Sequence, residues 1–309
     1  MNAWGWLLAA AAAAVQPLPP APAEPVAPLS EVIVLGPEPR YVAPTQRDRI
    51  GRIWAPVYLN QQGPFRLVLD TGANRSAVTP TVAEALGVQA RTTATAQVRG
   101  VTGITVAPMI RVSTMEIGDL LLQNVLLPVV PDVFGGAEGV LGNEGLRDKR
   151  IVIDFKRDFI SIKRSGRERP GEDFETLPIT MSRDHLLAID VLVGRVRAKA
   201  IIDTGAPDSL GNAALLKALK RQAEDEPSTE IVGVTLDVEY GSRVRMPTIQ
   251  MQNVKIRGAV LTFSDVYIFK HWRMTSQPTI MLGMDVLGVL DQIIIDYRTR
   301  ELHILTSDR

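Results

Sequence analysis

Asp70-Thr71-Gly72-Ala73 recurs 133 residues later as Asp203-Thr204-Gly205-Ala206, and each copy directly follows three apolar residues, at 67–69 and 200–202. A strand that ends in Asp presents its carboxylate at the edge of a sheet, and the Gly that follows permits a tight turn close to the site. The repetition therefore predicts a duplicated device that brings two carboxylates together. Such a pair can activate water without help from a metal or cofactor.

The segments around the two motifs also recur in the same order. Each motif follows two β-prone runs around a Gly-containing turn, which predicts a hairpin. A Ser, a short helical stretch, an apolar-apolar-Gly element and two closing strands come after it. Thr79 and Pro80 open the first helical stretch, and Thr79 is expected to cap it. The pairs are 55–69 and 187–202 (hairpins), Ser76 and Ser209, 79–86 and 212–220 (helices), 140–146 and 281–287 (Gly elements), 151–155 and 293–297, and 159–163 and 301–305 (closing strands). Repeated landmarks of this kind predict an internal duplication.

The duplication divides the chain into two lobes of similar length. We place the N-terminal lobe at 46–165 and the C-terminal lobe at 176–309, joined by a charged linker at 166–175 that is rich in Gly and Pro. Strand-like runs dominate both halves, with one or two short helices in each. The expected fold is mainly β, with two homologous lobes related by an internal pseudo-twofold axis.

The N-terminal segment predicts export. Residues 4–15 form an Ala-rich apolar run, too short to span a bilayer and followed by small residues, so 1–23 is predicted as a signal peptide. The absence of Lys and Arg before this run departs from the usual pattern. Residues 24–45 are rich in Pro and predict a tether or pro-segment, within which 31–35 is a candidate strand. The predicted location is periplasmic or secreted.

Composition excludes several other function classes. The chain has no Cys, which rules out disulfides, thiolate metal sites and Cys nucleophiles. Lys plus Arg equals Asp plus Glu at 34 each, so charge gives no reason to expect nucleic acid as a partner. His185, His271 and His303 are scattered along the chain and predict neither a metal site nor a catalytic triad with Ser76 or Ser209. We expect no cofactor and no metal.

These motifs resemble those of retropepsin-like aspartic peptidases, specifically the bacterial two-lobed kind. The matching residues are Leu69–Ala73 and Ile202–Ala206, together with the Gly elements that contain Gly142 and Gly283. The resemblance implies that Asp70 and Asp203 are catalytic. It also implies that Thr71 and Thr204 clasp each other beneath them, with close backbone packing at the two Gly elements. The supporting residues around the aspartates would be Thr71, Gly72, Ala73, Ser76, Gly142, Thr204, Gly205, Ala206, Ser209 and Gly283.

The family resemblance further implies flaps, which are hairpins that fold over the substrate about thirty residues after each Asp. The candidates are 98–104, with Gly100, Val101, Thr102 and Gly103 at its turn, and 230–235, which contains Gly233. No Tyr lies in the first candidate, so a pepsin-type flap contact cannot be assigned.

The predicted activity is hydrolysis of peptide bonds by water held between two aspartates. Two unit charges about 3 Å apart repel by roughly 5 kcal/mol at an effective dielectric of about 20, so the pair retains one proton at intermediate pH. Ala in the fourth position of each motif removes a hydroxyl donor that would favour ionisation, which predicts a pH optimum nearer neutral. The substrate would be an extended protein segment, such as one from a membrane-anchored periplasmic protein.

Both aspartates lie on one chain, so we expect an active monomer. The alternative from another class is a catalytically silent peptide-binding module with the same two-lobed cleft. Metal-assisted hydrolysis is a third reading, and the chain lacks the additional ligands that such sites collect.

Overall fold

The computed structural model describes residues 31–33, 52–88, 91–118, 120–181, 186–221 and 229–306. The predicted signal peptide at 1–23, most of the predicted tether at 24–45, and His185 lie outside this part of the chain. No helix in the described part is long and apolar enough to cross a membrane.

The first lobe is built around one twisted sheet with strand order β4-β8-β3-β2-β6-β5, and β7 pairs with β6. Its strands are β2 (Trp54–Leu59), β3 (Gln62–Leu69), β4 (Ala77–Val78), β5 (Arg91–Arg99), β6 (Ile104–Ile117), β7 (Leu120–Pro128) and β8 (Gly139–Leu141). The hairpin predicted at 55–69 is β2–β3. Helix α1 (Pro80–Ala85) follows β4, where the sequence predicted it.

The second lobe repeats this arrangement with additional strands, in the order β1-β19-β18-β13-β14-β21-β15-β20-β17-β16, with β12 paired to β13. The strands are β12 (Thr180–Met181), β13 (Leu187–Val193), β14 (Val196–Ile202), β15 (Leu210–Gly211), β16 (Thr229–Val232), β17 (Val238–Arg245), β18 (Ile249–Met251), β19 (Val254–Arg257), β20 (Val260–Phe263) and β21 (Thr279–Leu282). The helices are α2 (Ala213–Ala218), α3 (Tyr267–His271) and α4 (Met284–Leu287). The candidate strand near the N-terminus is confirmed as β1 (Glu31–Ile33), which pairs with β19.

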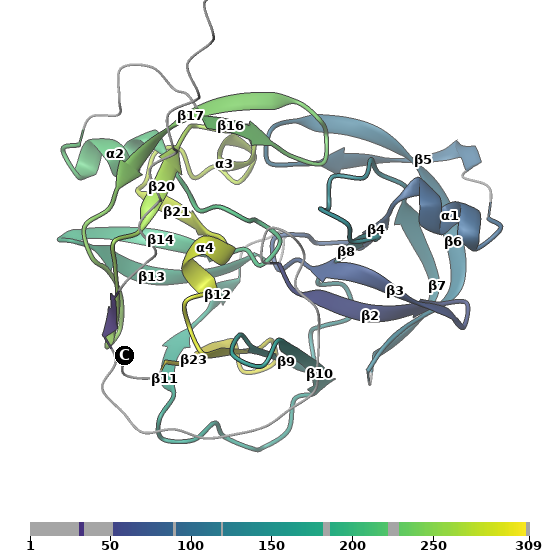
Figure 1. Ribbon diagram of the computed structural model, residues 1–309, viewed down its shortest axis with the longest axis horizontal. Coiled ribbons are helices and arrows are strands. Elements are labelled where there is room, and N and C mark those ends of the chain that lie inside the picture. Colours follow the sequence, from purple (N-terminus) through teal and green to yellow (C-terminus); the bar gives the residue numbers. More distant parts are fainter. Residues whose placement is uncertain are drawn as a thin grey trace, which may run out of the picture.

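The closing strands of both halves form one shared sheet below the two lobes (Figure 1), with the order β10-β9-β22-β23-β11. It consists of β9 (Lys149–Asp154), β10 (Phe159–Arg164), β11 (Glu175–Pro178), β22 (Gln292–Asp296) and β23 (Glu301–Leu305). At its centre β9 and β22 run antiparallel, with Ile151 opposite Ile295 and Ile153 opposite Ile293. Residues from both predicted lobes therefore hydrogen-bond to each other here.

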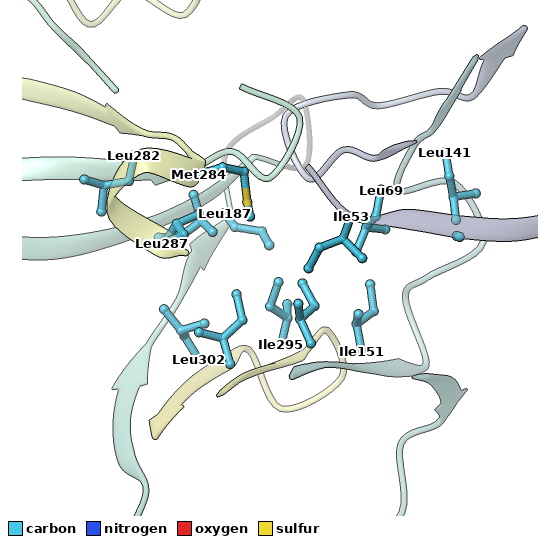
Figure 2. Packing of buried hydrophobic residues seen from close by; sticks show 14 of the residues in the cluster. Ile53, Leu69, Leu141, Ile151, Leu187, Leu282, Met284, Leu287, Ile295 and Leu302 are labelled. Carbon is cyan, nitrogen blue, oxygen red and sulfur yellow. The ribbon is translucent and has the colours of Figure 1, made fainter. Parts of the chain in front are cut away.

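The shared sheet carries its apolar face towards the lobes. Ile151, Ile153, Ile293 and Ile295 alternate along their strands and are fully buried, as the two-residue period of a strand requires. In Figure 2 the side chains of the sheet lie below those of the first lobe and the second lobe. The labelled neighbours are Ile53, Leu69 and Leu141 from one lobe and Leu187, Leu282, Met284 and Leu287 from the other. One hydrophobic core thus joins all three sheets.

The two equivalent helices begin differently. Asn212 accepts a hydrogen bond from Leu215 N through its side chain, which caps α2. The sequence predicted the same role for Thr79 at the start of α1. Thr79 does occupy the N-cap position, but its side chain makes no capping hydrogen bond, and that part of the prediction is wrong. Pro80 at the first helical position supplies a preset φ instead.

Replacing Ile295 by Ala should lower the free energy of unfolding by about 3 kcal/mol, because it leaves a cavity where three sheets meet. Urea denaturation followed by circular dichroism measures this. Val106, which is exposed, is the control: Val106→Ala should cost less than about 0.5 kcal/mol. Equal costs for the two variants would contradict a core shared between the lobes.

Candidate active site

The two Asp-Thr-Gly-Ala turns occupy equivalent places at the ends of β3 and β14. Each of these strands pairs in parallel with the strand that leads into the later Gly element, β8 or β21. The Asp70 amide donates to Leu141 O at 3.0 Å, and the Asp203 amide donates to Leu282 O at 3.0 Å. The later strand therefore fixes the backbone of each aspartate, in keeping with the close backbone packing that the family resemblance implied.

Each carboxylate is oriented by the amides of its own turn. Asp70 Oδ1 accepts hydrogen bonds from Gly72 N at 2.8 Å and Ala73 N at 2.9 Å. Asp203 Oδ1 accepts from Gly205 N at 3.0 Å and Ala206 N at 3.1 Å. These donors leave the other oxygen of each carboxyl group directed away from its own turn.

The two turns face each other so closely that only glycine fits at their tips. A Cβ on Gly72 would lie 2.7 Å from Asp203 Oδ2, and a Cβ on Gly205 would lie 2.5 Å from Asp70 Oδ2. The two carboxyl groups also hydrogen-bond to each other. The structure thus brings together the two aspartates that the sequence repeat singled out.

Beneath the carboxyl groups, the two threonines cross-link the lobes through four hydrogen bonds. Thr71 Oγ1 donates to Ile202 O at 2.6 Å and accepts from Thr204 N at 3.2 Å. Thr204 Oγ1 donates to Leu69 O at 2.7 Å and accepts from Thr71 N at 3.2 Å. Both threonines are 1% exposed. Each hydroxyl is therefore satisfied by the backbone of the other lobe, which is the clasp implied by the resemblance.

Behind each aspartate turn, a serine hydroxyl is hydrogen-bonded to the backbone of the later Gly element. Ser76 Oγ accepts from Gly142 N at 3.0 Å, and Ser209 Oγ accepts from Gly283 N at 2.9 Å. A Cβ on Gly142 would lie 2.7 Å from Arg75 N, and one on Gly283 would lie 2.8 Å from the Asp208 backbone. The serines are fully buried and serve as hydrogen-bonding supports within each lobe.

Two acidic residues complete this support and were missed in the sequence. Glu144 Oε1 accepts from Ser76 N at 2.7 Å, and Asp285 Oδ1 accepts from Ser209 Oγ at 2.6 Å. Each stands two residues after the Gly of its Gly element, at Gly142 or Gly283, so a residue-by-residue alignment of the two halves would have revealed them.

Burial controls the electrostatics of the pair. It raises the pKa of Asp70, against the lowering effects of the Gly72 and Ala73 amides, Asp203 and Arg52. The pKa of Asp203 is raised further, by burial and then by the charge of Asp70. A pair in which the second ionisation is this unfavourable holds one shared proton across an intermediate pH range.

The two candidate flaps are hairpins that reach across to each other from opposite lobes (Figure 1). The first turns between β5 and β6, and the second between β16 and β17. Thr102 Oγ1 and Thr235 Oγ1 are hydrogen-bonded at 3.2 Å and are 133 positions apart, the same spacing as Asp70 and Asp203. The flap tips and the two aspartates therefore share one pseudo-twofold relation.

Each flap tip packs against the opposite lobe. Val101 contacts the apolar cluster of the second lobe that contains Ala206 and Phe269, and its carbonyl accepts from Ile268 N at 3.1 Å. Val234 contacts the cluster of the first lobe beside Ala73. Among the predicted flap glycines, a Cβ on Gly100 would lie 3.0 Å from Val234 Cγ1, and one on Gly233 would lie 3.2 Å from Thr102 Oγ1. A Cβ on Gly103 would overlap the Asp237 carboxylate.

The described histidines stand apart from the aspartate pair. His303 is buried in the shared sheet, with Nδ1 at 2.8 Å from Thr176 Oγ1. His271 stacks on Tyr267. Within the described ranges, no group of three or more His, Cys, Asp or Glu side chains has the arrangement of a metal site.

Replacing Thr71 by Val should cost about 2 to 4 kcal/mol of stability, because it leaves Ile202 O and Thr204 N without their partner in a buried site. Chemical denaturation measures the loss. Thr95 is exposed on β5, and Thr95→Val is the matched control with an expected change below about 0.5 kcal/mol. A Thr71→Val protein as stable as this control would show that the clasp contributes nothing to the fold.

Comparisons with known proteins agree with this geometry. The family model described as aspartyl protease matches two separate regions, residues 55–144 and 189–286. Each region contains one aspartate turn and the glycine, Gly142 or Gly283, that supports it. The comparison with curated proteins found no match. Because the two matched regions cover more than half of the chain, this protein belongs to the aspartyl protease family, with one copy of the family's fold in each lobe.

Proposed function

We propose that this protein is an aspartic endopeptidase that cleaves an extended protein segment with water held between Asp70 and Asp203. The observation that carries the proposal is the buried pair itself: two carboxyl groups from equivalent turns, hydrogen-bonded to each other with raised pKa values. The ionised member takes a proton from water as its oxygen attacks the carbonyl carbon. The protonated member donates to the carbonyl oxygen, and the resulting diol collapses when a proton reaches the amide nitrogen.

The flaps would control access to this pair. In the structure each flap tip lies against apolar side chains next to the aspartate turn of the opposite lobe. An extended peptide has to displace these contacts before it can lie across both turns. Backbone groups at the flap turns could then pair with the peptide, which is how extended segments are commonly recognised.

The cellular setting is part of the same proposal. The apolar segment at 4–15 supports export, and a periplasmic enzyme would meet membrane-anchored or secreted protein segments. Processing of a particular envelope protein fits an enzyme whose flaps close over its substrate. Since both aspartates belong to one chain, the monomer is the active form.

Asp70→Asn and Asp203→Asn should each lower peptide cleavage at least about a thousand-fold, because each removes either the base or the acid. Cleavage is measured on a proteome-derived peptide mixture by mass spectrometry, with circular dichroism as the check on folding. Asp190 is exposed on β13, and Asp190→Asn is the matched control that should retain full activity. Retained cleavage in both active-site variants would exclude the dyad.

The optimum of the pH–rate profile should be shifted toward neutral, because activity requires one proton on the pair and burial raises both pKa values. Below the lower pKa no base remains, and above the upper pKa no acid remains. Ala73→Ser and Ala206→Ser add a hydroxyl donor near a carboxylate, which lowers its pKa and should move the acidic limb to lower pH. A wild-type optimum below about pH 4 would contradict this assignment.

The second candidate function is a catalytically silent peptide-binding module. The observation that favours it is the contact of both flap tips with each other and with the opposite lobes, which covers the aspartate pair. Binding of pepstatin without hydrolysis of any peptide in the mixture would support that reading. Loss of cleavage on adding a chelator would support metal-assisted hydrolysis instead.

A further inference from the structure

The two aspartates are related by the pseudo-twofold, but the residues facing them across the hairpin strands are chemically different. In the first lobe Trp54 lies opposite Val68, and Leu69 N donates to Ile53 O at 3.0 Å. Continuing this antiparallel register places Arg52 opposite Asp70. In the second lobe Ala188 lies opposite Ile201, so the same continuation places Leu186 opposite Asp203.

Both facing residues are buried, so the difference is not screened by water. Arg52 is 6% exposed and Leu186 is 1% exposed. Arg52 Nη1 donates across the lobe boundary to Gly205 O at 3.3 Å, and Gly205 itself lies against the Asp70 carboxyl group, since a Cβ there would overlap Asp70 Cγ. Leu186 instead packs with Ala188 and Ile201 in an apolar cluster. Of the two equivalent facing positions, the one opposite Asp70 therefore holds a buried cationic residue and the one opposite Asp203 holds an apolar residue.

From this arrangement we propose that Arg52 fixes the position of the shared proton: Asp70 is the ionised member of the dyad and Asp203 carries the proton in the resting protein. The charge of Arg52 stabilises a carboxylate at Asp70, whereas the apolar surroundings of Asp203 favour its neutral form. Burial is also unequal, since Asp203 is 7% exposed and Asp70 is partly exposed. The internal duplication has therefore produced two aspartates with different roles.

The other groups around Asp70 are consistent with this assignment. Each turn contributes two amide donors to its own aspartate, so these donors favour neither member. The hydrogen bond between the two carboxyl groups lowers the pKa of Asp70 and raises the pKa of Asp203. Tyr297, which follows β22 in the shared sheet, is buried, and burial and the charge of Asp70 raise its pKa. Tyr297 stays neutral and adds no charge, whereas the charge of Arg52 lowers the pKa of Asp70.

Under the proposed function, this assignment gives each aspartate a definite role. Asp70 takes the proton from the attacking water, and Asp203 donates its proton to the carbonyl oxygen of the substrate. Arg52 touches neither water nor substrate in this scheme and acts through Asp70, as a positioning residue.

The test is a pH titration of the substrate-free protein labelled with ¹³C at the aspartate carboxyl groups, followed by NMR. Asp70→Asn and Asp203→Asn identify the two signals. The pair should titrate in two steps. In the wild type the step at lower pH should change mainly the Asp70 signal, and the step at higher pH should change mainly the Asp203 signal. A lower step carried by Asp203 would overturn the proposal, and this measurement needs no Arg52 variant and no activity.

Variants of Arg52 test the cause. Arg52→Leu, which reproduces the residue opposite Asp203, should raise the lower step by about one pH unit, while Arg52→Lys should keep it near the wild-type value. Arg111 is exposed on β6, and Arg111→Leu controls for the change in net charge. An unchanged lower step in folded Arg52→Leu would overturn the role of Arg52. The proposed activity is judged separately. If the wild type cleaves peptides, Arg52→Leu should shift the acidic limb of its kcat/KM profile by the same amount as the lower titration step seen by NMR. If the wild type cleaves nothing, the proposed function fails, while the NMR result still decides the proton position.

Discussion

The reciprocal hydrogen bonds of Thr71 and Thr204 are the constraint on which the site depends. Each hydroxyl satisfies the backbone of the opposite lobe, so neither turn can take its position without the other. The Asp70 and Asp203 carboxyl groups would repel each other if both were ionised. The neutral clasp beneath them holds the two turns together against this repulsion. A buried hydroxyl-to-carbonyl bond suits this purpose because it contributes no charge of its own.

The shared sheet performs the same function on a larger scale. The strands that close each half pair with each other at β9 and β22 rather than returning to their own lobe, and their Ile side chains fill the space beneath both turns. The lobes are thereby fixed to a common base, while the flaps close over the aspartate turns from the other side. Most of the bonding between the lobes lies in the shared sheet and the clasp, whereas the flap tips are held by the Thr102–Thr235 hydrogen bond, the hydrogen bond from Ile268 N to Val101 O and apolar contacts.

Much of this arrangement could be predicted from repeated motifs. The aspartate turns, the β2–β3 and β13–β14 hairpins, the short helices and the Gly elements all follow local patterns, and local patterns report reliably on strands and turns. Alignment of the two halves could also have predicted three further residues. Glu144 and Asp285 occupy equivalent positions after the two Gly elements, and Thr235 occupies the position equivalent to Thr102. The absence of a side-chain cap at Thr79 could not be foreseen, since a residue type indicates a cap but does not orient its hydroxyl.

By itself, the sequence determined that the chain is duplicated and that two aspartates occupy equivalent turns. Repetition of short motifs is visible in one dimension. Only the tertiary structure decided that the closing strands form a common sheet, that the flap tips meet at Thr102 and Thr235, and that Arg52 faces one aspartate while Leu186 faces the other. These features arise from pairing between segments distant in the chain, and the register of that pairing determines which side chains share a buried, weakly screened environment.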